Sequence, residues 1–360
     1  MSKYLALTST LSVFTLNLGA LCLGVCLGLT GCSGSSNSTN PDQVVVIVSG
    51  GNAISPFTSP DLSCQQGTPA GSTDTVLRQE LLNAGYTVYT SPANAGPGQV
   101  LSDPGFLGFS DCPVVLPSSM TVDATGDIDK AGEHLARFLS YLNTEYGVTT
   151  VNLVGHSMGG LFSRAAIRVL QQQDSPIKIR SLTTLGTPWQ GAIAGDYAVG
   201  STPLSSCAGN ELCEETFISF KKLVDAGALA GREVTRKYLT GPGGWNERQG
   251  NVLAGIPVVL LGGDRFQLEG GDPFVWPNDG LVIPPSAFAV DVPDTVLPHR
   301  RCTSYYDTHS LYFSAAAKLK DQTALTADPH VIDAVIDAIN SADTALETPN
   351  RIGCPPPTVK

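Results

Sequence analysis

The chain has 360 residues, of which 42% are hydrophobic and 15% charged, and its formal net charge is −11. This length and composition predict a globular protein with one large domain or two. The net negative charge argues against nucleic acid or an anionic bilayer as an electrostatic partner.

Residues 1–31 are predicted to be a targeting segment outside the folded domain. Lys3 is their only charge, and a long, mostly apolar run follows from Tyr4 to Leu27. The closing sequence, Leu-Thr-Gly-Cys at 29–32, resembles the bacterial lipobox, which implies that Cys32 becomes a lipid-modified N-terminus and binds the membrane. An ordinary secretory peptide cut nearby, or an uncleaved membrane anchor, is the alternative. Residues 32–42 are then a polar tether, and we expect an exported, membrane-anchored bacterial lipoprotein of the cell envelope or cell surface.

Six cysteines remain when the leader and Cys32 are set aside. An even number in an exported chain predicts three disulfides, although six cysteines permit fifteen pairings. None has the spacing of a zinc site, so we expect no metal. Proximity in the sequence suggests the pairs Cys64 with Cys112, Cys207 with Cys213, and Cys302 with Cys354.

The first half of the domain predicted over residues 43–360 alternates strands and helices. Five β-branched residues in a row at 44–48 predict a buried strand, and an apolar stripe that stops at Gly147 predicts an amphipathic helix. In chain order we expect a strand at 44–48, a short helix at 75–83, a strand at 85–89, a long loop over the site mouth at 91–124, and the helix at 127–146.

Residues 151–167 predict a strand, an abrupt turn and a helix. Gly155, Ser157 and Gly159 match the pattern Gly-x-Ser-x-Gly, in which a serine occupies a strained turn that glycines on either side tolerate. An apolar, β-prone run enters this turn, and apolar residues at helical spacing leave it. The context predicts that Ser157 is a nucleophile at the carboxyl end of a sheet, with a buried turn serine as the alternative.

The sequence Gly-His-Ser-Met-Gly-Gly at 155–160 resembles the nucleophile elbow of α/β-hydrolase lipases and esterases. Residues 181–191 are similar to the strand and Gly-Thr-Pro-x-x-Gly turn of bacterial lipases, and the resemblance covers most of residues 44–340. It implies an α/β-hydrolase fold, with a mainly parallel sheet flanked by helices, in keeping with the alternating elements. It also implies that the segment at about 191–256, where we find little strand or helix regularity, is a lid or cap; a plain surface helix is the alternative for its apolar stripe.

The resemblance also implies two backbone donors for an oxyanion. In the family, the strand matching 44–48 ends in His-Gly-x, and by position the donor here is the amide of Gly51, with Asn52 as the neighbour that could be confused with it. The chain departs from the family by having Ser49 in place of the histidine. A backbone donor does not depend on that side chain. The second donor is the amide of Met158, and a plain glycine turn is the alternative for 50–51.

The remaining elements are a strand at 257–263 and a closing helix at 328–339, whose cap is Asp328 with proline at the first position. A serine nucleophile needs a base and a third group that holds the base in one tautomer. In this fold the chain order is serine, acid, histidine.

His309 is the expected base, because its surroundings resemble the family's histidine loop. His299, interpreted as an exposed basic turn, is the alternative, and His330 is interpreted as a capping or surface residue. The expected acid is Asp279, in a turn similar to the Asn-Asp-Gly-x-Val turn of bacterial lipases. Asp264, just beyond the strand at 257–263, is the runner-up.

These residues predict a serine hydrolase that cleaves carboxylic (acyl or lipid) esters through an acyl-enzyme, without a cofactor. The triad sets the reaction and the pocket sets the substrate, so an amidase, a thioesterase or a polyester depolymerase stays open. A catalytically inert, hydrolase-fold lipoprotein that binds a ligand is the alternative of a different class.

Overall fold

A parallel sheet of seven strands forms the centre of the computed structural model, which describes residues 43–61, 76–101, 114–346 and 350–357. The strand order is β2-β1-β5-β6-β7-β8-β9, so the order reverses beside β1. The strands of this sheet are β1 (Gln43–Val48), β2 (Thr87–Thr90), β5 (Thr150–His156), β6 (Lys178–Leu185), β7 (Val258–Gly263), β8 (His299–Tyr305) and β9 (Asn350–Ile352). A second, two-stranded sheet pairs β3 (Ala93–Asn94) with β4 (Val122–Asp123).

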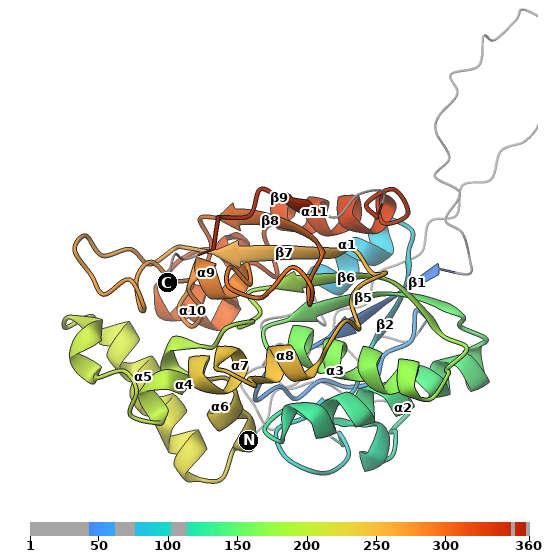
Figure 1. Ribbon diagram of the computed structural model, residues 1–360. Coiled ribbons are helices and arrows are strands. Elements are labelled where there is room, and N and C mark those ends of the chain that lie inside the picture. The colour runs from blue at the N-terminus through green and yellow to red at the C-terminus, as the bar shows by residue number, and fades with distance from the viewer. Residues whose placement is uncertain (1–42, 62–75, 102–113, 347–349, 358–360) are drawn as a thin grey trace, which may run out of the picture. The chain divides into compact units, whose positions relative to one another are not determined.

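Helices cover both faces of the large sheet (Figure 1). On one face lie α1 (Arg78–Asn83) and α11 (Pro329–Asn340), and on the other α2 (Ile128–Tyr146) and α3 (Gly159–Gln172). Two short helices, α9 (Pro284–Ala287) and α10 (Leu311–Ala316), follow β7 and β8 along the chain. The predicted α/β class, with a mainly parallel sheet flanked by helices, is confirmed.

The core has one apolar cluster on each face of the sheet. Val46 and Val48 of β1 belong to the cluster under α2 and α3, while Val45 and Ile47 belong to the cluster with α11. Alternate residues of a strand point to opposite faces, so a run of five buried β-branched residues supplies both clusters. This explains why 44–48 carries no polar residue.

The long helix α2 begins and ends where the sequence predicts. Asp127 caps its first turn by accepting a hydrogen bond from the Lys130 N–H at 2.8 Å, and Gly147 ends it with φ 67°. In α11, Asp328 is the cap and Pro329 the first residue, as expected. These boundaries depend on local capping chemistry, which is why the sequence alone reveals them.

Two segments differ from the expectation. Residues 91–124 are not a single loop, because β3, β4 and a 3-10 turn at Ser118–Met120 lie within them. Residues 191–256 are not irregular, because they contain five helices in the described structure. These are α4 (Ile193–Ala198), α5 (Glu211–Asp225), α6 (Leu229–Glu233), α7 (Arg236–Thr240) and α8 (Trp245–Arg248).

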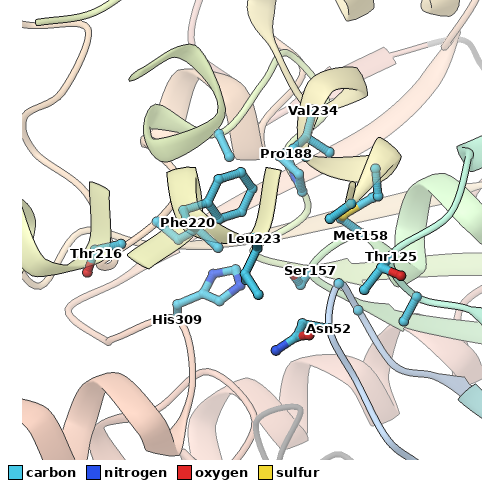
Figure 2. Close-up of a pocket in the computed structure, with 18 of the residues that line it drawn as sticks. Asn52, Thr125, Ser157, Met158, Pro188, Thr216, Phe220, Leu223, Val234 and His309 are labelled. Atoms are coloured by element: carbon cyan, nitrogen blue, oxygen red, sulfur yellow. The ribbon is translucent and has the colours of Figure 1, made fainter. Parts of the chain in front are cut away.

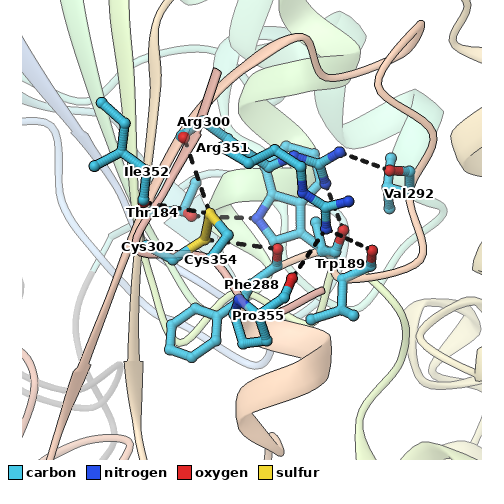
Figure 3. The surroundings of a disulfide bond; sticks show 12 residues. Thr184, Trp189, Phe288, Val292, Arg300, Cys302, Arg351, Ile352, Cys354 and Pro355 are labelled. Atoms are coloured by element: carbon cyan, nitrogen blue, oxygen red, sulfur yellow. Dashed lines mark hydrogen bonds between the residues drawn. A yellow bond between two sulfur atoms is a disulfide. The ribbon is translucent and has the colours of Figure 1, made fainter. Parts of the chain in front are cut away.

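Two disulfides confirm two of the three expected pairs. Cys207 pairs with Cys213 in the first turn of α5, and Cys302 of β8 pairs with Cys354 just after β9. Figure 3 shows the second bridge beside Phe288 and Trp189. It attaches the last strand to the edge of the sheet. The pair Cys64 with Cys112 lies outside the described residues, as do the leader and Cys32.

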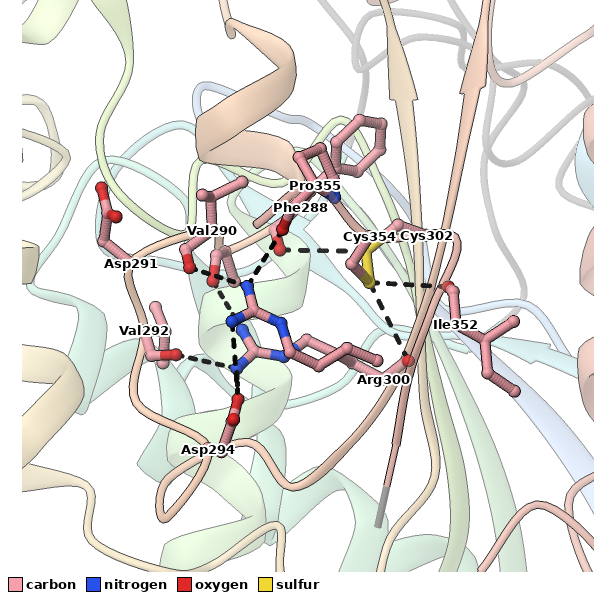
Figure 4. Close-up of polar contacts among 12 residues, drawn as sticks. Phe288, Val290, Asp291, Val292, Asp294, Arg300, Cys302, Ile352, Cys354 and Pro355 are labelled. Carbon is pink, nitrogen blue, oxygen red and sulfur yellow. Dashed lines mark hydrogen bonds and ion pairs between the residues drawn. A yellow bond between two sulfur atoms is a disulfide. The ribbon is translucent and has the colours of Figure 1, made fainter. Parts of the chain in front are cut away.

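A buried guanidinium fixes the same corner of the molecule (Figure 4). Arg300 of β8 donates hydrogen bonds to the carbonyl oxygens of Ala289 and Val292 and to the carboxylate of Asp294. Burial lowers the pKa of Arg300 from its ordinary value. Arg351 of β9 donates to the Val290 carbonyl at 2.8 Å. The segment that follows α9 is therefore tied to the last two strands.

No helix within the described ranges is both long enough and apolar enough to cross a bilayer. Over the same residues, no group of three or more His, Cys, Asp or Glu side chains is arranged to hold a metal ion.

Candidate active site

Ser157 lies in a sharp turn between β5 and α3, at the carboxyl end of the sheet. Its φ is 54°, a left-handed conformation that costs a non-glycine residue about 1–2 kcal/mol. Two hydrogen bonds hold the turn: the Ser157 N–H donates to the Leu185 carbonyl at 2.8 Å, and the Thr187 hydroxyl donates to the Ser157 carbonyl at 2.7 Å. Such strain, held by surrounding bonds, is typical of functional residues.

The two glycines of the pattern are required by close approach of the backbone. A Cβ on Gly159 would lie 2.1 Å from the Val48 carbonyl oxygen, and one on Gly155 would lie 2.5 Å from the Gly160 nitrogen. Neither backbone atom can move aside without disrupting β1 or α3. The pattern Gly-x-Ser-x-Gly is therefore a steric requirement of this turn.

His309 and Asp279 are in direct contact. The Nδ1 of His309 lies 2.8 Å from the Oδ2 of Asp279, and the His309 N–H donates to the Asp279 carbonyl at 2.7 Å. Both side chains are buried. Because a carboxylate only accepts, Nδ1 carries the proton, and Nε2 is left as the basic nitrogen.

The Asp279 carboxylate is itself fixed by the turn that follows it. Its Oδ1 accepts hydrogen bonds from the N–H groups of Leu281 and Val282, at 2.9 and 2.7 Å. One oxygen is thus held by backbone and the other faces the imidazole. The backbone N–H groups and the imidazole therefore bind different oxygens, and Oδ2 is free to orient the histidine.

The Nε2 of His309 has no hydrogen-bond partner among the described residues, although it is buried. His309 and Ser157 line the same cavity. Hydrogen bonds between a base and its nucleophile are often long in unliganded sites and shorten in the substrate complex. His309 Nε2 is therefore available to a ligand in the cavity that Ser157 also lines.

The alternative residues lie elsewhere. Asp264 follows β7 and accepts a 3.3 Å hydrogen bond from Ser304, not from a histidine. His299 is not an exposed turn as expected, because it begins strand β8 and is buried. His330 is exposed in the first turn of α11, as expected. None of the three lines the cavity that contains Ser157.

The turn after β1 lies against Ser157. Gly51 and Met158 both line the cavity, and no hydrogen-bond acceptor is found for either amide within the described part of the chain. The Asn52 amide, by contrast, donates to the Ala124 carbonyl at 3.1 Å. Of the two neighbours left open by the sequence, only Gly51 has an amide available for a ligand.

A cavity of about 360 Å³ opens over these groups (Figure 2). It lies beside β1 and β5, where the strand order reverses, which is the usual ligand site of open parallel sheets. No Lys, Arg, Asp or Glu is among the described residues that line it. Its apolar wall comes mainly from α5 and α6 and the residue after them: Phe220, Leu223, Val224, Ala230, Gly231 and Val234.

Asp307, two residues before His309, is a buried acid outside this cavity. Burial, together with a hydrogen bond to Asp328, raises the pKa of Asp307 to about 7. Its own backbone carbonyl accepts a hydrogen bond from the Arg265 N–H at 3.2 Å. The histidine loop is therefore attached to the turn after β7.

Two neighbours of the candidate triad were missed from the sequence. A Cβ on Gly186 would lie 2.8 Å from the His309 Nδ1 and 3.0 Å from the Asp279 Oδ2. The Nε2 of His156 lies 2.9 Å from the His309 carbonyl, and the two rings pack with centroids 4.9 Å apart. Both residues lie in the segments 155–160 and 181–191 that resemble bacterial lipases. The sequence therefore draws attention to them, but it does not reveal their contacts, because these form only in the folded chain.

Comparison with known proteins agrees with this architecture. Residues 118–210 match a family model described as an alpha/beta hydrolase of unknown function. Two triacylglycerol lipases, from Pseudarthrobacter phenanthrenivorans and Burkholderia plantarii, are each 39% identical over 66 residues, which is 18% of this chain. The match spans only 19% and 17% of the length of these relatives.

Among solved structures, a Bacillus licheniformis lipase in its mature form is similar, with 16% sequence identity and a TM-score of 0.46. The similarity covers 78% of this chain and 91% of that lipase. The family match over 118–210 includes Ser157 and the whole elbow. This family match and the parallel sheet with its helical layers assign the chain to the α/β-hydrolase fold.

Proposed function

We propose that the protein is a serine hydrolase of neutral carboxylic esters. The observation on which this rests is the buried Asp279–His309 pair, which faces the cavity that also contains the strained Ser157. In α/β hydrolases this combination performs acyl transfer. The triacylglycerol lipases that match part of the chain agree with an ester substrate.

In the proposed reaction, His309 Nε2 takes the proton of Ser157 as its oxygen attacks the ester carbonyl. The Asp279 carboxylate stabilises the imidazolium, and the amides of Gly51 and Met158 receive the oxyanion. The imidazolium then protonates the leaving alcohol. Water attacks the acyl-enzyme with His309 again as the base, which releases the acid and restores the serine.

The cavity wall favours a neutral, apolar acyl group. The described residues that line it include no Lys, Arg, Asp or Glu, so none of these side chains offsets the desolvation of a charged substrate. A volume of about 360 Å³ is near the lower end of ligand pockets, which are roughly 300–1,000 Å³. We therefore expect short and medium acyl chains to react faster than long ones.

A chromogenic ester series from acetyl to palmitoyl tests this proposal. The protein would be the soluble domain without residues 1–32, beside Ser157→Ala, with and without detergent. We expect hydrolysis that is lost in Ser157→Ala and declines toward palmitoyl. The proposal fails if no ester is turned over, or if the variant is as active as the parent domain.

For the N-terminus we propose lipid attachment at Cys32 and a location in the cell envelope, on the sequence Leu-Thr-Gly-Cys alone. Growth of an expressing bacterium with labelled palmitate provides the test. Label should enter the full-length chain and be absent from Cys32→Ala. Equal labelling of both chains would exclude this cysteine.

A further inference from the structure

We propose that Asn52 positions the Gly51 amide, through its left-handed backbone rather than through its side chain. This inference rests on the proposed hydrolase function, because it concerns the oxyanion donor. Six non-glycine residues have a positive φ in the described structure, and only two of them, Ser157 and Asn52, line the cavity. The φ of Asn52 is 57°.

The turn that contains Asn52 is pressed against the nucleophile. A Cβ on Gly50 would lie 2.4 Å from the Ser157 Cβ, and one on Gly51 would lie 2.8 Å from the Met158 Sδ. The chain therefore passes directly over the serine and must then turn away from it. The left-handed conformation at Asn52 makes that turn.

Two amides of this turn donate hydrogen bonds within the protein. The Asn52 N–H donates to the Ala124 carbonyl at 3.1 Å, and the Ala53 N–H donates to the Gly50 carbonyl at 3.3 Å. The Gly51 N–H, which precedes them, has no acceptor in the described part of the chain. Rotation at Asn52 would lose the bond to Ala124 and redirect the Gly51 amide, because the two peptides are adjacent.

The acceptor of this bond is held from two sides. The Ala124 N–H donates to the Asn94 carbonyl at 2.8 Å, and the carbonyl of the next residue, Thr125, accepts from Ala230 of α6 at 3.0 Å. The acceptor is thus fixed to the small sheet and to the helical segment over the cavity. Asn52 links the Gly51 amide to this fixed point.

Asparagine suits the position because, apart from glycine, it is the residue that adopts left-handed backbone most readily. Alanine tolerates this conformation less well, and a β-branched valine is a genuine outlier there. Substitutions at position 52 can therefore separate backbone from side chain. Glycine removes the carboxamide but keeps the conformation, whereas alanine removes the carboxamide and disfavours the conformation.

The test compares Asn52→Gly, Asn52→Ala and Asn52→Val in the soluble domain, with kcat and KM for a butyryl ester. We expect Asn52→Val to lower kcat by up to roughly a hundredfold, the effect of losing one oxyanion donor. Asn52→Ala should lose roughly tenfold, and glycine should recover most of that loss. KM should change little, because the ground-state carbonyl depends less on the donor than the oxyanion does.

A second readout is the affinity of an alkyl boronic acid, whose adduct with a serine is tetrahedral. Its affinity should fall in the same order as kcat. Asp174→Val is the matched control: Asp174 also has a positive φ, 49°, but is exposed and does not line the cavity. It should share any loss of thermal stability and leave kcat unaffected.

The inference is overturned if glycine and alanine lose kcat equally, which would assign the role to the carboxamide. It is also overturned if valine keeps kcat, or if all the loss lies in KM. Failure of the proposed function looks different, because the parent domain and Ser157→Ala would then hydrolyse the ester at the same rate.

Discussion

At the scale of single residues, the geometry separates two acids that the sequence left open. Asp279 faces the Nδ1 of His309, whereas Asp264 contacts Ser304. The separation depends on which loop folds toward the histidine, and no local pattern contains that information. The Asn-Asp-Gly sequence predicts only a turn with an acid in it.

We expect Asp279→Asn to lower kcat by roughly 10⁴-fold, because the amide would favour the tautomer that leaves no basic nitrogen toward Ser157. The Oδ1 contacts with the backbone can persist in the amide, so the fold should be retained. Steady-state kinetics and circular dichroism would check both points. Asp264→Asn is the control, and a larger loss in that variant would reverse the assignment.

Gly186 offers a second prediction at this scale. Its φ is 58°, and a Cβ there would press on both His309 and Asp279. We expect Gly186→Ala to lower kcat at least a hundredfold, since a displacement of about 1 Å can cost that much in rate. Ester kinetics and thermal unfolding would measure it.

Gly250→Ala separates this contact from backbone strain. Gly250 also has a positive φ, 62°, but a Cβ added there would have no neighbour within 4 Å. Both variants should lose stability of about 1 kcal/mol from the left-handed backbone. If Gly250→Ala lost as much kcat as Gly186→Ala, the contact with the pair would not be the cause.

At the scale of elements, the sequence predicted the strands and helices with strong local patterns. Strand β1 is a continuous apolar run, and α2 has a cap, a stripe and a terminal glycine. The short helices α4, α6, α7 and α8 were missed because each has only four to six residues. Helices this short are unstable alone and depend on tertiary packing.

Strand β8 was missed for a related reason. Its sequence begins His-Arg-Arg, which favours solvent, yet Arg300 is buried because backbone carbonyls and Asp294 accept its hydrogen bonds. Buried charge is tolerated only when such partners exist. They come from residues 289–294. This segment lies next to β8 only in the folded protein, so the sequence does not reveal the contact.

Packing between α5 and α6 predicts control of acyl-chain length. A Cβ on Gly231 would lie 2.4 Å from the Val224 Cγ2 and 3.2 Å from the Phe220 Cε1, and both side chains line the cavity. Gly231→Ala should push them into it and narrow the acyl site. We expect the ratio of kcat/KM for octanoyl over acetyl esters to fall roughly tenfold, within the range for a methylene-sized change in a pocket.

Gly255→Ala is the matched control for this substitution, because a Cβ there would extend into open space and its φ is not positive. It should leave the chain-length profile unaltered. A profile that Gly231→Ala also leaves unaltered would place the acyl chain elsewhere.

At the scale of the whole molecule, the buried acid Asp307 predicts how stability depends on pH. Its pKa in the folded state is about 7, against an unfolded value of about 3.9. The folded state therefore retains this proton over a range where the unfolded state has lost it. The stabilisation is complete below about pH 4 and is lost as pH rises toward 7.

Asp307→Asn should remove this dependence, because the amide stays neutral at every pH. Relative to the parent protein, the variant should be more stable at pH 8 than at pH 5. Urea unfolding at several pH values would measure the difference, with the exposed Asp333→Asn as the control. If the free energy of unfolding changed with pH in the same way in the parent and in Asp307→Asn, Asp307 would not be the source of the pH dependence.

Covalent labelling tests whether Ser157, activated by His309, is the nucleophile. An alkyl fluorophosphonate would be incubated with the soluble domain, and intact mass and peptide mapping would locate the adduct. We predict one adduct per chain, on Ser157, absent in Ser157→Ala and formed much more slowly in His309→Ala. An adduct on another residue, or ester hydrolysis that persists in Ser157→Ala, would show that Ser157 is not the nucleophile.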